Sequence, residues 1–135
     1  MKPILRKTHL VTGLSLLVIF PLTGAYLRYR VPHLMEGSDR YRFSMRGNHI
    51  YILLSGLIHL ALGVYFRQVT AGWLSKVQAF GSGLLLLSSV FVVAAFFFEP
   101  KIFLARPHTL SAMVLALTGM LLHAVCVLLA EVKSA

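Results

Sequence analysis

The side chains with the clearest capacity for chemistry in this sequence of 135 residues are its six histidines. They are His9, His33, His49, His59, His108 and His123. All except His33 lie within or at the ends of long apolar runs, where ionisable side chains are uncommon and usually functional. The runs contain no Asp or Glu, which argues against a proton pump and favours imidazoles that act as metal ligands. His33 lies in a polar stretch and is expected to be an ordinary surface histidine.

Four apolar runs carry these histidines, at about 10–27, 50–66, 77–98 and 109–130. Each has about the 20 residues that a helix needs to cross a bilayer. The chain is 58% hydrophobic, and its charged residues lie between the runs. Short connections favour an up-down-up-down order of helices. The sequence therefore predicts an all-α, integral membrane four-helix bundle, a single domain over 1–135 with helices at about 8–28, 47–67, 76–98 and 107–131.

The net charge of +9 comes from Lys and Arg residues that flank the apolar runs. Such side chains extend towards lipid headgroups, so the charge predicts contact with a lipid bilayer and no binding of nucleic acid. The basic residues are divided almost equally between the two expected surfaces, so the charges do not decide the orientation.

Local patterns add detail to the expected bundle. Residues 29–46 mix aromatic side chains with arginines and are expected to form an interfacial loop. Trp73 is expected in the short loop before the third helix, as an anchor at the level of the headgroups. Gly81 and Gly83 are expected to let the third helix approach a neighbour closely, and Pro107 is expected to open the fourth helix.

The depths of the histidines predict how they pair. The second and fourth helices run in the same direction, and His49 and His108 open them, so both lie near one surface. His123 follows His108 by fifteen residues, which places it about 22 Å deeper, near the surface where His9 opens the first helix. Imidazoles on facing helices of a bundle are the usual axial ligands of b-type haem. We therefore expect two bis-histidine haem b sites per chain, His49 with His108 and His9 with His123.

His59 does not fit this scheme of two pairs. It follows His49 by ten residues, about 15 Å, so it could partner His123 in place of His9. It could instead form a hydrogen bond to a neighbouring helix or support a haem ligand. Depth alone does not choose between His9 and His59.

Small and basic residues accompany the candidate ligands. Small residues share the helix faces of the histidines, and although a porphyrin needs such gaps, close helix packing is the better explanation for them. These small residues are Gly13, Gly56, Gly63, Ala112 and Gly119. Arg6, Arg46 and Arg106 flank the ligands and could pair with haem propionates, or simply anchor the helices at the interface.

This histidine pattern resembles the bacterial di-haem cytochrome b561 family. The matching segments are KTHLVTGL around His9, SDRYRFSMRGNHIYILLSG around His49 and RPHTLSAMVLALTGMLLHAV around His108 and His123. The resemblance implies two b haems in a four-helix core, with two ligands from the fourth helix and one each from the starts of the first and second. Two features depart from the family: one more residue than usual separates the histidines of the fourth helix, and His59 has no counterpart.

Two haems stacked across a bilayer would carry single electrons between its two faces. The resemblance implies a quinone or quinol as one partner, superoxide or a soluble electron carrier as the other, and the bacterial inner membrane as the location. The segment 29–46 beside His49 is the candidate place for the quinone. Whether such a protein is an enzyme is left open, and a homo-oligomer is compatible with the sequence.

Three other functions stay open on the sequence. One is a haem-bearing anchor subunit without turnover of its own, and another is a copper- or zinc-binding membrane protein that uses the histidines as ligands. The third is a structural membrane subunit whose histidines only form hydrogen bonds between helices. The chain has one cysteine, Cys126, which is expected to be a packing residue because no cysteine-based metal motif accompanies it.

Overall fold

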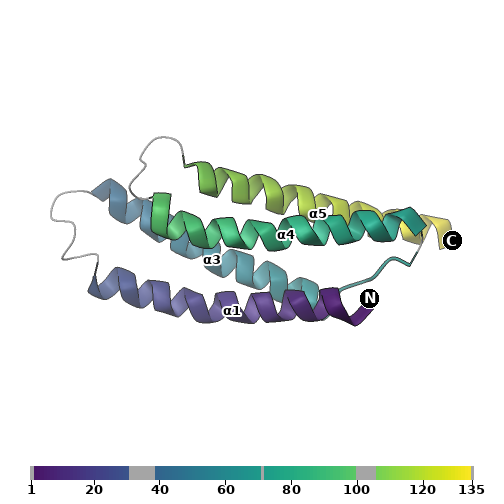
Figure 1. Cartoon of the computed structure of the whole chain (residues 1–135), viewed down its shortest axis with the longest axis horizontal. Helices are drawn as coiled ribbons and strands as arrows, with labels where there is room; N and C mark the ends of the chain where they lie inside the picture. The colour runs from purple at the N-terminus through teal and green to yellow at the C-terminus, as the bar shows by residue number, and fades with distance from the viewer. Residues whose placement is uncertain (1, 31–38, 71, 100–105, 135) are drawn as a thin grey trace.

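The computed structural model describes residues 2–30, 39–70, 72–99 and 106–134, and these form an up-down-up-down bundle of four long helices (Figure 1). The helices are α1 (Lys2–Tyr29), α3 (Asp39–Tyr65), α4 (Gly72–Phe98) and α5 (Pro107–Ser134). Both chain termini lie at the same end of the bundle, as an even number of antiparallel helices requires. The expected all-α four-helix fold is confirmed.

All four helices are long and apolar enough to cross a membrane. Their outward faces carry large apolar side chains at helical spacing, as in Val11, Leu14, Val18 and Leu22 of α1, all of them more than half exposed. A water-soluble protein rarely exposes such continuous apolar surface, whereas lipid requires it. The chain is therefore a membrane protein whose helices present their apolar sides to lipid.

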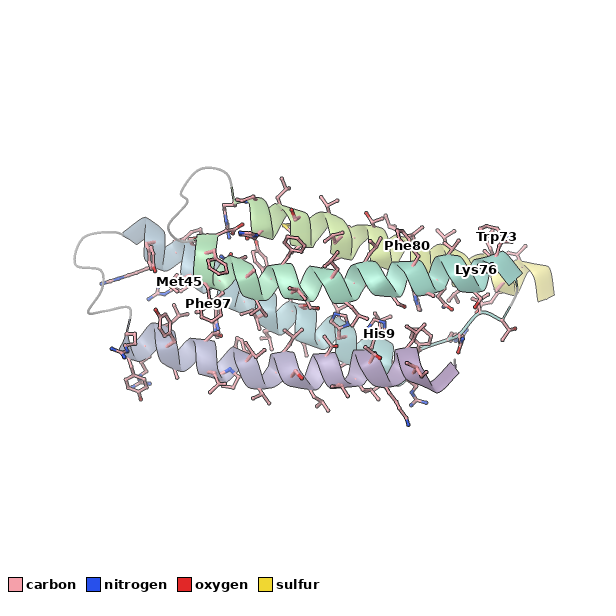
Figure 2. The ribbon with its side chains drawn as sticks, in the orientation of Figure 1. His9, Met45, Trp73, Lys76, Phe80 and Phe97 are labelled. Atoms are coloured by element: carbon pink, nitrogen blue, oxygen red, sulfur yellow. The ribbon has the colours of Figure 1, made fainter. Side chains whose placement is uncertain are left out.

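Three helices begin earlier than the sequence predicts: α1 at Lys2 instead of at about 8, α3 at Asp39 instead of at about 47, and α4 at Gly72 instead of at about 76. Helix α3 begins at Asp39, so much of the expected loop 29–46 is helical, and Trp73 lies in the first turn of α4 instead of in a loop. Figure 2 shows Trp73 and Lys76 near the start of α4, at the end of the bundle that holds both termini. Hydropathy marks the part of a helix that lies in lipid, but backbone hydrogen bonding continues into the polar interface. Pro107 does open α5, as predicted.

Glycines bring the helices together as two close pairs, α1 with α3 and α4 with α5. A Cβ atom on Gly63 of α3 would lie 2.5 Å from Cγ of Leu10 in α1. A Cβ atom on Gly119 of α5 would lie 2.7 Å from the carbonyl oxygen of Gly81 in α4. Close helix packing is thus confirmed as the role of these glycines, while the prediction for Gly83 is wrong because a Cβ there meets nothing within 4 Å.

The interior of the bundle contains two apolar clusters with buried polar side chains between them. One apolar cluster contains Met45, Ile52 and Phe96, and a second at the opposite end contains Leu74 and Cys126. The packing role predicted for Cys126 is confirmed, since its side chain is buried in that second cluster. Between the two clusters, α4 buries the polar side chains of Gln78, Ser82, Ser88 and Ser89. This polar stretch of α4 faces the buried histidines.

Candidate functional site

A buried cluster of three histidines lies in the half of the bundle nearer the termini. His9 of α1 and His59 of α3 are almost completely buried, and their Nδ1 atoms are 2.7 Å apart. Their rings stack with a centroid distance of 5.0 Å. Figure 2 shows His9 on the side of α1 that faces the rest of the bundle. His59 also contacts α4, where its Nε2 lies 2.6 Å from Oγ of Ser89.

The third histidine of the cluster is His123 of α5. Phe66, at the end of α3, connects it to the others: the Phe66 ring lies 5.0 Å from the His123 ring and 5.9 Å from the His9 ring. His123 is also within range of electrostatic interaction with His9. Its Nε2 lies 3.5 Å from the side-chain nitrogen of Gln78, whose amide is itself held by the backbone of the α3–α4 connection. All four helices thus contribute a polar side chain to one buried region.

Two ring nitrogens in this cluster are buried and have no hydrogen-bond partner among the described residues. They are Nε2 of His9 and Nδ1 of His123. A buried polar atom without a partner destabilises a folded protein by about 1–3 kcal/mol, so such atoms are rare. A neutral imidazole offers a metal the lone pair of the ring nitrogen that does not carry its hydrogen. His9 is suited to bind a metal or a metal cofactor through Nε2. In His123, Nε2 accepts the 3.5 Å contact from the Gln78 amide, so Nδ1 would bind a metal only after the ring hydrogen moves to Nε2 and that contact is given up.

The histidines expected at the other surface, His49 and His108, lie at the same end of the bundle but face different neighbours. His49 packs against α1, where its ring stacks on Phe20 at 4.1 Å. His108 packs against α4, with its ring near those of Phe91 and Phe98. The two imidazoles are not brought together, because the close contacts pair α3 with α1 and α5 with α4. His33 lies outside the described residues.

A threonine on α1 fixes the ring of His49. Thr23 directs its hydroxyl hydrogen to the backbone carbonyls of Ile19 and Phe20, at 3.0 and 2.8 Å. The hydroxyl oxygen therefore accepts a hydrogen bond from Nδ1–H of His49, at 2.9 Å. This arrangement leaves the lone pair of the His49 ring on Nε2, the form in which imidazole binds metals when its other nitrogen is held by a protein group.

The three candidate arginines have different surroundings. Arg6 donates a hydrogen bond from Nε to the carbonyl of Gly63, at 2.9 Å, and so ties α1 to α3 near His9. Arg46 is exposed one turn before His49. Arg106 reaches α3, where it donates to Oδ1 of Asn48, the residue before His49.

The residue pattern did not predict a polar cluster beside Arg106 at the end of the bundle opposite the termini. Glu99, buried at the end of α4, accepts hydrogen bonds from the backbone N–H and the hydroxyl of Thr109 and lies 3.6 Å from Nε of Arg106. Asn48 donates to the carbonyl of Ala95 and so joins α3 to the same cluster. The cluster connects α3, α4 and α5 between His49 and His108. The sequence feature that could have indicated this cluster is Glu99 itself, an acidic residue at the end of the apolar run 77–98.

The environment of Glu99 favours its charged form. Burial works to raise the pKa of this carboxyl, but the hydrogen bonds from Thr109 and Asn48 and the charge of Arg106 outweigh burial, so the pKa lies below its ordinary value. Glu99 is therefore a carboxylate at neutral pH, paired with Arg106 and bound to the first turn of α5. A negative charge at that position also interacts favourably with the dipole of α5.

Hollows between α3 and α5 give access to the buried polar region. One is lined by His59 and Ser55 of α3 and by Ala112 and Ala116 of α5, with α4 at its base. A second, nearer the termini, is lined by His123. Ile58 lines both. An apolar molecule in the membrane could therefore reach the histidine cluster from this side.

Neither a metal site with three or more protein ligands among the described residues nor a similar known protein accounts for this histidine cluster. Among the described residues, no group of three or more His, Cys, Asp or Glu side chains is arranged to hold a metal ion. No protein-family model, curated protein or solved structure matches the chain.

Proposed function

We propose that the chain is a membrane-embedded b-type cytochrome that carries single electrons across the bilayer through bis-histidine haem sites. The observation that carries this proposal is the pair of buried ring nitrogens without partners, Nε2 of His9 and Nδ1 of His123. They come from helices at opposite sides of the bundle core and share an apolar neighbour in Phe66. A haem bound there would supply reversible one-electron chemistry at iron.

The residues around His9 and His123 fit such a group. The interior offers the lone pair on Nε2 of His9, the imidazole of His123, whose Nδ1 would gain a lone pair when the contact from Gln78 is released, and the aromatic ring of Phe66. The hollow lined by His123 supplies an opening towards lipid. A site with two protein imidazoles suits a haem, whose porphyrin supplies the other iron ligands, better than a free metal ion, which needs additional ligands from the protein.

The second proposed site is formed by His49 and His108. In its support, Thr23 holds His49 in the form that leaves Nε2 as a ligand atom, and both histidines lie at the same end of the bundle. Because the two rings face different helices, binding at this site requires both side chains to turn towards the space between α3 and α5. We therefore expect this site to take up haem less readily than the His9–His123 site.

The proposed electron partners are a quinone or quinol on one side and superoxide or a soluble electron carrier on the other, in the bacterial inner membrane. The resemblance of the histidine pattern to the cytochrome b561 family supports these choices. Arg6, Arg46 and Arg106 remain the proposed partners of the haem propionates. Of these, the exposed Arg46 has the most freedom to move towards such a group.

The test is a haem count on the protein purified in detergent after expression with added haem precursor. Pyridine haemochrome quantitation and spectra of the oxidised and dithionite-reduced protein should give two haems per chain and a sharp reduced α-band. His9→Ala and His123→Ala should each lose the same single haem. His33→Ala, at the histidine that the sequence assigns to neither pair, is the matched control and should keep both.

Other outcomes would replace the proposal. A colourless protein that contains stoichiometric copper or zinc by elemental analysis would favour the metal-binding alternative. A protein free of both haem and metal would favour a structural subunit. Haem that is bound but never reduced by quinol in membranes, with or without a soluble acceptor, would favour a haem-bearing anchor subunit.

Electron transfer across the bilayer has its own assay. The haem-loaded protein is placed in liposomes that contain ferricyanide, and a membrane-impermeant reductant is added outside. Bleaching of the enclosed ferricyanide should depend on the protein and should fall strongly in His123→Ala. Equal bleaching in empty liposomes and in liposomes with protein would refute transmembrane electron transfer.

A further inference from the structure

His59 is the one histidine of the buried cluster with both ring nitrogens engaged. Its Nδ1 faces Nδ1 of His9, and its Nε2 faces Oγ of Ser89. Binding a metal through His59 would require one of these two hydrogen bonds to break. His9, in contrast, has a ring nitrogen without a hydrogen-bond partner among the described residues, and His123 has only the long 3.5 Å contact from Gln78 to give up. His59 is therefore the least suited of the three to be a ligand.

The hydroxyl of Ser89 determines the direction of the hydrogen bonds. It lies 3.3 Å from the carbonyl of Leu85 and 3.1 Å from the hydroxyl of Ser55. If Ser89 donates to the carbonyl, it accepts from Ser55 and from Nε2–H of His59, and every donor in the group has an acceptor. If Ser89 instead donated to Nε2 of His59, then Nδ1–H of His59 would donate to Nδ1 of His9, and the hydrogen of His9 would sit on Nε2. That N–H is buried and would have no acceptor, and buried unpaired N–H groups are very rare. The first arrangement is therefore favoured.

We infer that His59 is a positioning residue for His9. Because its Nε2 carries the hydrogen donated to Ser89, Nδ1 of His59 has the lone pair and accepts a hydrogen bond from Nδ1–H of His9. This contact holds the lone pair of His9 on Nε2, the buried atom without a partner. Ser89 of α4 and His59 of α3 thus fix the orientation of a ring on α1.

The packing of the helices supports this role. Gly56 and Gly63 bring the backbone of α3 against α1 on either side of His59: a Cβ atom on Gly63 would lie 2.5 Å from Cγ of Leu10, and one on Gly56 would lie 3.2 Å from Cβ of Leu16. The approach makes the short contact between His9 and His59 a fixed feature of the α1–α3 pair. The identity of the group that His9 binds rests on the proposed function, but the hydrogen-bond arrangement does not.

The test compares four variants of the haem-loaded protein by haem content and by redox titration. His59→Leu removes the acceptor, and His59→Gln replaces it with an amide oxygen. Ser89→Ala removes the group that sets the direction. Ser88→Ala is the matched control, because among the described residues the hydroxyl of this buried serine bonds to the carbonyl of Leu85 in its own helix and to no histidine.

His59→Leu should keep both haems, and the midpoint potential of one should rise. Without the acceptor, the His9 imidazole is a weaker electron donor to iron, which favours the reduced state. Ser89→Ala should shift the same potential in the same direction by less, His59→Gln should lie near wild type, and Ser88→Ala should not differ from it. Loss of one haem in His59→Leu, with both retained in His9→Ala, would overturn the inference and make His59 the ligand. Unchanged potentials with both haems present would also overturn it.

A second readout does not need haem. Nitrogen-15 NMR of histidine-labelled protein from a haem-deficient host should show His9 as a single tautomer with its proton on Nδ1. His59→Leu should show a mixture of tautomers. This pattern in a protein that never binds haem would uphold the positioning role while the proposed function fails. A His9 proton on Nε2 in the wild-type protein would refute the positioning role.

Discussion

Replacing Glu99 with glutamine should destabilise the protein several times more than the same change at Glu131. Both carboxylates pair with an arginine. Glu99 is almost fully buried at the end of α4 and lies near Arg106, whereas Glu131 pairs with Arg67 at 2.6 Å on the surface near the termini. Side-chain exposures of 76% for Arg67 and 56% for Glu131 leave that pair largely solvated. The two substitutions change the same chemical group in opposite environments.

The contacts set the size of the difference. Glu99 accepts two hydrogen bonds from Thr109 and one from Asn48, and hydrogen bonds to a charged group contribute about 1.5–3 kcal/mol each. Glutamine keeps one carbonyl acceptor but turns an amide towards a donor and leaves Arg106 without its partner. We expect Glu99→Gln to lower the free energy of unfolding by about 3 kcal/mol. An exposed ion pair contributes less than about 1 kcal/mol, so Glu131→Gln should stay below that value.

The assay is unfolding by SDS in mixed micelles, followed by far-ultraviolet circular dichroism for wild type and both variants. Glu99→Gln should clearly lower the SDS midpoint relative to wild type, and Glu131→Gln should leave it nearly unchanged. Equal midpoints for the two variants would show that the polar cluster at the ends of α4 and α5 does not hold the bundle together.

Three further predictions concern the pH dependence of stability, the packing of a glycine and the burial of the cysteine. The pKa of Glu99 is lower in the folded protein than its ordinary value of 4.5, so the carboxylate stabilises the fold fully above pH 4.5. This contribution to the free energy of unfolding is lost as the pH falls through the folded-state pKa. Thermal unfolding scans from pH 7 to pH 3 should show the loss in wild type and not in Glu99→Gln. Gly119→Ala should be less stable than Gly83→Ala by about 1–3 kcal/mol in SDS unfolding, since only the first Cβ meets the neighbouring helix; equal stabilities would contradict the packing. Cys126 should resist N-ethylmaleimide in the native micelle and react after unfolding, whereas fast native labelling would place it outside the core.

The bundle could be predicted from the sequence because the same pattern, a long apolar run bounded by charged residues, occurs four times. Each apolar run is long enough to span a bilayer, and Pro107 marks the start of α5. The starts of α1, α3 and α4 were less predictable. Residues 39–46 contain arginines that a hydropathy pattern assigns to a loop, although such side chains can extend from a helix into the headgroups.

The depths of the histidines could also be predicted, but not the directions in which they point. Counting residues along the helices brought His9 and His123 to the same end, and the structure has them in one cluster. His49 faces α1 and not α5, because the glycines of α3 pack against α1. A sequence shows that glycines allow a close approach, but not which helix approaches them.

The sequence leaves several roles open for His59 and does not decide among them. Its hydrogen bonds reach His9, fifty residues earlier, and Ser89, thirty residues later. Three helices must be assembled before these contacts exist. The same holds for Glu99, whose partners Asn48 and Thr109 lie on two other helices.

The most direct test of the account is electron paramagnetic resonance of the oxidised, haem-loaded protein. Low-spin ferric signals typical of two axial imidazoles are expected in wild type. One of these signals should disappear in both His9→Ala and His123→Ala and persist in His59→Leu. Absence of any low-spin haem signal in wild type, or a signal that survives the loss of His123, would contradict the assignment of His9 and His123 as the ligands of a buried haem.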